Sequence, residues 1–251
     1  MRHPLLSVAS IAALSLTLSA CGAGGDSREA LSVCTDVPYP PFEFQDASAA
    51  LGYSGFDMEL IVAIADHLDY QVAIVETGFD EITSGTAMES GACDLAISAI
   101  SISASSEEVI DFSEPYYEAQ QSLLVPQESS ITSLADLGEG VTVGVQTGTA
   151  GEFYARENVR GAEIFDSSDD LVALLNTGQV DAVIQDLAVN AEEAVKGEAT
   201  IVETYATGEY FGIAFAKGSP LVGPVNEALD ALRSDGTYDA VYETYFPISG
   251  E

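Results

Sequence analysis

Basic residues are scarce in this chain. Seven Lys and Arg stand against 41 Asp and Glu, a formal net charge of −34, and no Lys or Arg lies between Arg28 and Arg156. Such a field repels nucleic acid and anionic lipid head groups, so neither is expected as a partner. Most of the acids are expected to form a solvated surface that keeps the protein soluble.

Long apolar runs are also absent beyond the N-terminus. The run at 5–18 follows a short positive region, and it is too short and too early for a permanent membrane span. It ends in the sequence LSAC, which is similar to a lipobox, where a signal peptidase cuts before Cys21 and the thiol is lipidated. We expect a signal peptide over 1–20 and a lipidated, flexible tether over 21–30 that anchors the protein to the outer face of the cell membrane. The alternative is an ordinary signal peptide with a chance Cys.

Histidine and cysteine are few, which limits metal chemistry. After cleavage, His67 is the only His and Cys34 and Cys93 are the remaining Cys beyond Cys21. No Cys/His metal cluster is possible, and neither a metal nor a cofactor is expected. Cys34 and Cys93 lie in or beside predicted strands of an exported protein, so we expect a disulfide between them. Two buried free thiols are the alternative.

What is present is a regular apolar pattern. Hydrophobic residues make up 47% of the chain, enough for one large domain or two small lobes and too many for disorder. Apolar runs alternate with helical patterns, which predicts a mainly parallel α/β sheet. Strands are expected at 31–35, 70–76, 94–100, 141–145, 162–166 and 180–186, and helices at 56–68, 83–90, 148–158, 168–178 and 187–197.

Two further features favour a pair of lobes. Residues 87–98 and 174–185 both read as a helix, a Gly that ends it, then an Asp and a strand, with Gly91 and Gly178 in the left-handed position. Strand-like runs at 119–130 and 206–218 are candidate crossings between the lobes, which would leave a cleft between them. The C-terminal segment predicts two helices broken at Gly236.

Four motifs stand together in order, at 35–44 (TDVPYPPFEF), 55–68, 110–125 and 234–246. With VGVQTGT and VDAVIQD they span nearly the whole mature chain. As a set they resemble the polar-amino-acid class of extracellular solute-binding proteins (solute-binding family 3), which deliver ligands to ABC importers. The resemblance implies a type II periplasmic-binding-protein-like fold, a monomer of two α/β lobes that close on a small solute. Lobe 1 is expected at 31–124 and 212–251, and lobe 2 at 125–211.

The resemblance also implies the binding residues. The family's contacts to the ligand side chain match Asp36, Tyr39, Phe42 and Phe79. The groups that face the α-ammonium and α-carboxylate match Ser98, Ala99 and Ser101, and the helix N-terminus that binds the carboxylate matches Thr149 and Ala150. Asp186 matches the acid that binds the α-ammonium. Simpler roles stay open: Tyr39 and Phe42 could plug a core edge, Phe79 could be plain core, and Asp186 or Thr149 could be only a helix cap.

One position departs from the family pattern. After SIT and two more residues the family has an Arg that binds the ligand's α-carboxylate, and here Ser106 holds that place, between Ser105 and Glu107. Losing one partner of a buried charge pair typically costs about 3–5 kcal/mol, which helix amides near Thr149 cannot fully replace. Because Asp36 and Asp186 are kept, the cleft is expected to favour a small amine or a basic amino acid.

Two rival functions remain open at this stage. Some dehydratases resemble the family, and Glu43, Glu81 and Asp36 are candidate acid–base groups by location. No His lies nearby and no G-x-S-x-G nucleophile motif occurs, so a binding protein is expected rather than an enzyme. A sensor lobe of a larger receptor is disfavoured, since no transmembrane run follows the C-terminal helices.

Overall fold

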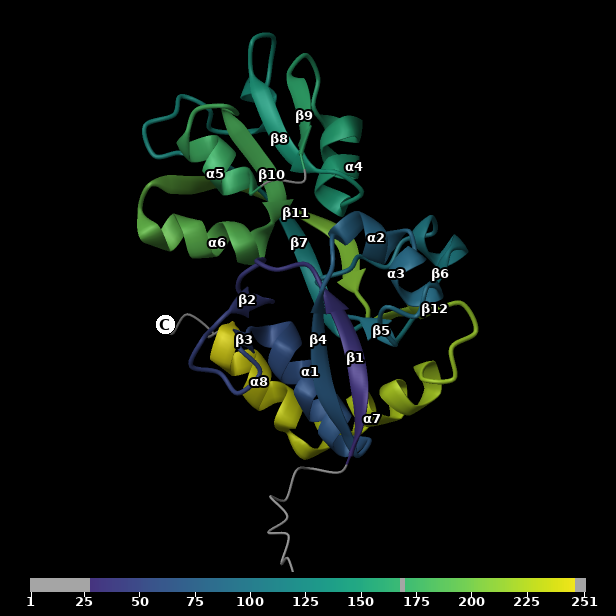
Figure 1. Ribbon diagram of the computed structural model, residues 1–251. Helices are drawn as coiled ribbons and strands as arrows, with labels where there is room; N and C mark the ends of the chain where they lie inside the picture. The colour runs from purple at the N-terminus through teal and green to yellow at the C-terminus, as the bar shows by residue number, and fades with distance from the viewer. Residues whose placement is uncertain (1–27, 168–169, 247–251) are drawn as a thin grey trace, which may run out of the picture.

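The computed structural model describes residues 28–167 and 170–246, so the predicted signal peptide and Cys21 lie outside the described residues. These form two α/β lobes, each built on a five-stranded sheet (Figure 1). Among the described residues, no helix has the length and apolar character needed to cross a membrane. The two-lobed α/β architecture expected from the motifs is confirmed.

The first lobe surrounds a sheet of order β4-β1-β5-β12-β6. Its strands are β1 (Glu29–Thr35), β4 (Tyr70–Glu76), β5 (Leu95–Ala96), β6 (Ile110–Phe112) and β12 (Ala214–Ala216), with a small β2 (Phe44–Gln45) and β3 (Tyr53–Ser54) pair beside them. Its helices are α1 (Phe56–His67), α2 (Phe79–Thr83), α3 (Thr86–Glu89), η1 (Ser106–Glu108), α7 (Val222–Asp235) and α8 (Thr237–Tyr245). The apolar faces of α1 and α7 form one core with β1 and β5.

The second lobe surrounds a sheet of order β11-β7-β10-β8-β9. Its strands are β7 (Tyr117–Pro126), β8 (Thr142–Gln146), β9 (Glu163–Ser167), β10 (Ala182–Asp186) and β11 (Ala199–Phe211). Its helices are η2 (Leu134–Asp136), α4 (Ala150–Asn158), α5 (Leu171–Asn176) and α6 (Leu187–Lys196). The fully buried β10 places its carboxyl end, Asp186, at the edge that faces the first lobe (Figure 1).

The two long strands β7 and β11 connect the lobes. They pair antiparallel from Ala199↔Pro126 to Phe211↔Tyr117, with irregularities in register between Tyr205 and Glu209. The predicted lobe boundary at 124/125 falls inside β7 and the one at 211/212 falls at the end of β11. The division into 31–124 with 212–251 and 125–211 therefore stays a proposal. Because β1 begins at Glu29, it overlaps the tether predicted for 21–30.

Several expected elements need correction. The sheets are mixed rather than mainly parallel, because β12 in the first sheet and β7 and β11 in the second run antiparallel to their neighbours. The strand expected at 94–100 is reduced to β5, since the chain turns at Ala99, which has a φ of 47°. The second crossing strand starts at Ala199, well before the predicted 206, because this stretch pairs with β7.

The repeated helix–Gly–Asp–strand segment has the same structure in both lobes. Gly91 and Gly178 adopt left-handed φ values of 75° and 71° at the ends of their helices. In the first lobe the Asp94 carboxylate accepts the amide of Ser32 at 2.8 Å, and in the second Asp181 accepts the amide of Thr142 at 2.8 Å. Asp94 thus links the start of β5 to its neighbour β1, and Asp181 links the start of β10 to its neighbour β8.

Cys34 and Cys93 form a disulfide, with their Cα atoms 5.7 Å apart. The bond joins β1 to the turn before β5, strands that already pair through Cys34 and Ala96. The predicted pairing is confirmed.

We expect neither thiol of this pair to react with an alkylating reagent in the exported protein until a reductant is added, because an oxidising compartment preserves a buried disulfide. Mass spectrometry of the alkylated protein, with and without reduction, measures this. Carbamidomethyl groups on both Cys34 and Cys93 in the unreduced sample would contradict the bond.

Candidate functional site

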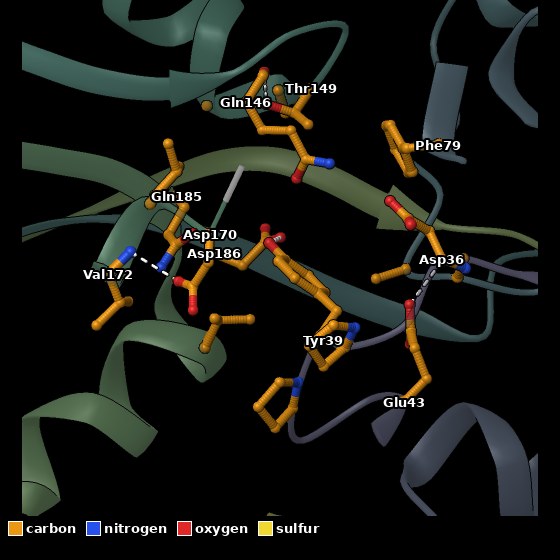
Figure 2. A pocket seen from close by; sticks show the side chains of 18 of the residues that line it. Asp36, Tyr39, Glu43, Phe79, Gln146, Thr149, Asp170, Val172, Gln185 and Asp186 are labelled. Atoms are coloured by element: carbon orange, nitrogen blue, oxygen red, sulfur yellow. Dashed lines mark hydrogen bonds between the residues drawn. The ribbon is translucent and has the colours of Figure 1, made fainter. Parts of the chain in front are cut away.

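A cavity of about 320 Å³ lies between the two lobes. From the first lobe it is lined by the loop after β1, the start of α2 and the turn after β5. From the second lobe it is lined by β7, the starts of α4 and α5, the end of β10, α6 and β11. Its polar and aromatic lining includes Asp36, Tyr39, Glu43, Phe79, Ser98, Ser101, Gln121, Gln146, Thr149, Asp170, Gln185, Asp186 and Glu209. Figure 2 shows Tyr39 near the centre, with Asp186 on one side and Asp36 and Phe79 on the other.

Most of the residues suggested by the family pattern come together here. The cavity is lined by Asp36, Tyr39, Phe79, Ser98, Ala99, Ser101, Thr149, Ala150 and Asp186, which are distant in sequence. That they bind a ligand remains a prediction. Two of the suggested residues, Phe42 and Ser106, do not line it.

Phe42 is part of the aromatic core of the first lobe. It is fully buried, and its ring lies 5.1 Å from that of Tyr117 and 5.3 Å from that of Phe211. Edge-on ring contacts of this kind stabilise a core beyond the apolar area that they bury. Phe42 therefore supports the loop that carries Tyr39, which matches the alternative of a core plug.

Ser106 closes a turn rather than facing the cavity. Its hydroxyl donates to the carbonyl of Ser103 at 3.0 Å and accepts the Ser103 amide at 3.0 Å, at the start of η1. Neither Arg156 nor Arg160 lines the cavity, and Arg156 is held by Glu152 at 2.7 Å and Asp166 at 2.6 Å. The position that carries the family's carboxylate-binding Arg thus supplies no charge here.

Asp186 is the centre of a polar cluster formed by side chains from β7, β10 and β11 and from the loop after β1. It is 8% exposed, and its carboxylate accepts the hydroxyl of Tyr39 from the opposite lobe. Gln121 on β7 donates one amide hydrogen to Asp186 at 2.7 Å and another to Glu209 on β11 at 2.9 Å. Asp186 holds the N-cap position of α6, yet its side chain makes no capping bond. Its side chain is therefore directed to this cluster.

Burial and the neighbouring carboxylate act together on Asp186. Loss of solvation, and then repulsion from Glu209, raise the pKa of Asp186 to about 8. Burial likewise raises the pKa of Glu209, against the hydroxyl of Ser101 and the amide of Gln121 that lower it. No ion pair to either acid is present in the described part of the chain, so a bound cation would stabilise both in their ionised form.

The first lobe adds two further acids. Ser98 donates its hydroxyl to Glu43 at 2.6 Å and accepts the amide of Asp36 at 3.0 Å. Burial raises the pKa of Asp36 and, more strongly, that of Glu43, which also lies near the buried Asp57. One carboxylate oxygen of Glu43 has no hydrogen-bond partner within the described ranges.

Within residues 28–167 and 170–246, Lys196 is the one base that lines the cavity. It stands at the C-terminal end of α6, where its ammonium pairs with Glu193 on the same helix. Thr149 begins α4, and its hydroxyl oxygen accepts the amide of Glu152 at 3.3 Å. The predicted cap role of Thr149 is therefore observed, beside its place in the lining.

A two-lobed α/β fold with a polar cavity between the lobes defines a class of hinged binding proteins. The chain matches the family "Bacterial extracellular solute-binding proteins, family 3" over residues 31–248, and it belongs to that family. It is 30% identical over 260 residues to the "Probable histidine-binding protein" of Neisseria gonorrhoeae, covering 96% of this chain and 95% of the relative.

Two solved structures are similar over most of the chain. An ancestral arginine-binding protein bound to arginine is 37% identical, with a TM-score of 0.77, over 87% of this chain and 99% of the other. The ancestral amino acid-binding protein AncCDT-1, a precursor of cyclohexadienyl dehydratase, is 35% identical with a TM-score of 0.77, over 86% and 95% of the chains. These similarities confirm the type II periplasmic-binding fold.

Proposed function

We propose that this protein captures a small cationic solute, an amine or a basic amino acid, and delivers it to an ABC importer. The observation that carries the proposal is the acidity of the cavity: six carboxyl groups, those of Asp36, Glu43, Asp170, Asp186, Glu193 and Glu209, line it, and Lys196 is the one base that does so among the described residues. Opposite charges interact with about 4 kcal/mol at 4 Å near a protein surface, so this lining selects cations.

The setting of the proposal follows from the family and the N-terminal sequence. Relatives of this chain carry names for histidine and arginine binding, and the side chain of arginine is a permanent cation that suits a lining of acids. We propose that the mature protein is a monomer, held at the outer face of the membrane by a lipid on Cys21. The importer's membrane subunits would then receive the solute directly from the lobes.

A thermal-shift screen of the mature protein tests the proposal. Basic amino acids and diamines should raise the melting temperature, because a ligand at 100 times its dissociation constant stabilises the folded state by about 2.7 kcal/mol. Glutamate and aspartate should produce no shift, since their side chains would meet the carboxylate lining. Stabilisation by glutamate alone would overturn the proposal.

Catalysis is the second candidate function, because one similar structure is a precursor of a dehydratase. Glu43 and Asp36 line the cavity, whereas Glu81 does not. The raised pKa of Glu43 suits a proton donor, but its hydrogen bond from Ser98 and its buried position suit a structural role equally. Recovery of intact ligand after long incubation supports the binding protein; a dehydrated or cleaved product would support a lyase.

A further inference from the structure

The second-lobe end of the cavity presents acceptors and almost no donors. Gln121 donates both amide hydrogens, one to Asp186 and one to Glu209, and so holds the two carboxyl groups side by side. Gln121 is only 1% exposed, so its amide is fixed in this bridge and its buried Oε1 is not open to a ligand. The hydroxyl of Tyr39 is already donated to Asp186. The carboxyl groups of Asp186 and Glu209 are therefore two acceptor groups at one place, and they can accept the N–H donors of an ammonium or guanidinium group.

An α-amino acid is a poor match for this end. Its carboxylate is attached to the same carbon as its ammonium, so binding the ammonium at Asp186 brings the carboxylate close to Glu209. Glu209 is held in place by the hydroxyl of Ser101 and by Gln121. Like charges at such separation repel, and the low dielectric of a buried site strengthens the repulsion.

The charged side chains that could offset this repulsion are absent or already engaged, which leaves the backbone amides at the start of α4. Ser106 carries no charge and is bonded within its own turn. Lys196 pairs with Glu193 at the far end of α6, about 15 Å along the helix from Asp186. At the start of α4 the carboxylate of Glu152 already accepts the amide of Gly148 at 2.7 Å, so the partial charge of about +0.5 at that helix end is shared with an anion.

The opposite end of the cavity suits a second cation. Asp36 lies there with Phe79, and the amide of Gln146 points toward them from the other lobe (Figure 2). A second hollow of about 280 Å³, lined by Asp36, Phe79, Asp80 and Gln146, adjoins the cavity at this end. A cation held by Asp36 and Asp80 would also lie beside the aromatic ring of Phe79. The site thus has two acidic ends with space between and beyond them.

From this arrangement we propose that the ligand is an elongated dication without a carboxylate, an alkyl diamine or a guanidino-alkylamine. One cationic end lies against Asp186 and Glu209, and the other against Asp36 and Phe79. The proposal rests on the proposed function, since it narrows the cationic solute to one chemical class.

Matched pairs of ligands that differ only in the carboxylate test the proposal by calorimetric titration. The pairs are L-arginine with agmatine, L-lysine with cadaverine, and L-ornithine with putrescine. At least one amine should bind tenfold or more tightly than its amino acid. Equal or tighter binding of the amino acid in every pair would overturn this inference and leave the proposed function standing. If no member of any pair binds, the proposed function itself fails.

The substitution Glu209→Gln tests whether the charge of Glu209 causes the preference for the amine over the amino acid. The Gln side chain keeps the size and can keep the hydrogen bonds to Ser101 and Gln121, so the fold should persist. Agmatine should bind about tenfold more weakly and L-arginine as tightly or more tightly, because the repulsion on its carboxylate is removed.

Glu118→Gln is the matched control, since Glu118 is exposed on the adjacent strand and lies outside the cavity. It should change neither affinity. If Glu209→Gln weakens both ligands equally, Glu209 only shapes the site and the inference is wrong. Ser106→Arg, which restores the family's base, should shift the preference toward L-arginine in the same way.

Discussion

Asp186→Asn is expected to weaken binding of a cationic ligand by roughly 2–3 kcal/mol, or about 30- to 150-fold. Asp186 supplies a buried carboxylate whose own partners, Tyr39 and Gln121, are both donors to it. Asn keeps the shape and can keep both contacts in part, but it removes the negative charge that a cation needs. Calorimetric titration with agmatine and L-arginine measures the loss.

The same substitution should stabilise the ligand-free protein. Because the pKa of Asp186 is raised from 3.8 to about 8, the folded state holds a proton that the unfolded state has lost at neutral pH. Stability that depends on this group therefore falls as pH rises from about 4 to about 8. Asn removes this penalty, with a ceiling of about 4 kcal/mol at pH 7 and no gain near pH 3, where both states are protonated.

Chemical denaturation of both proteins across this pH range checks the sign. Glu192→Gln is the control, since Glu192 is exposed on the helix that Asp186 begins and lies outside the cavity. It should change neither affinity nor the pH dependence of unfolding. If Asp186→Asn leaves the affinity unaltered, Asp186 only supports Tyr39 and Gln121. If the variant is less stable than the wild-type protein at pH 7, the raised pKa of Asp186 does not destabilise the folded state as argued.

Local sequence patterns predicted the lobes, and the family resemblance predicted the residues that the structure brings together at the cavity. The Asp at the end of a buried strand, the Gly that ends a helix and the Cys beside neighbouring strands each have a local signal, and the structure shows Asp186 at the cavity, Gly178 in the left-handed conformation and Cys34 bonded. These features depend on a few adjacent residues. Patterns of that length are what an isolated sequence can show.

The acceptor cluster of the second lobe had no such signal. Gln121 and Glu209 lie on β7 and β11, and they meet only because these strands pair with an irregular register between Tyr205 and Glu209. A shift of one residue turns a side chain to the other face of the sheet, so alternation along the sequence could not place Glu209. The sequence left Phe42 open between a ligand contact and a core plug for a related reason, since its aromatic neighbours come from distant segments.

Binding of a cation should also tighten as pH rises from 6 to 8, approaching tenfold per pH unit. Below about pH 8 Asp186 carries a proton, and a cation binds the ionised form, so binding must release that proton. Diamines keep their charge in this range, because alkylammonium groups have pKa values near 10.4. Tyr39, whose pKa is raised by burial and by Asp186, stays neutral, while Glu209 and Glu43, with raised pKa values, change affinity in the same direction.

Calorimetry in two buffers of different ionisation enthalpy counts the protons directly. At pH 7 agmatine binding should release close to one proton from the wild-type protein, and fewer from Asp186→Asn, which has no proton to lose at that position. The affinity of the variant should also depend less steeply on pH, and any remaining slope belongs to the other carboxyl groups of the cavity whose pKa values are raised by burial, Asp36, Glu43 and Glu209. A pH-independent affinity with no buffer dependence would show that Asp186 is already ionised in the free protein. The repulsion between Asp186 and Glu209 would then be balanced by some group other than the ligand, and the acidic end of the cavity would not select cations by relief of that repulsion.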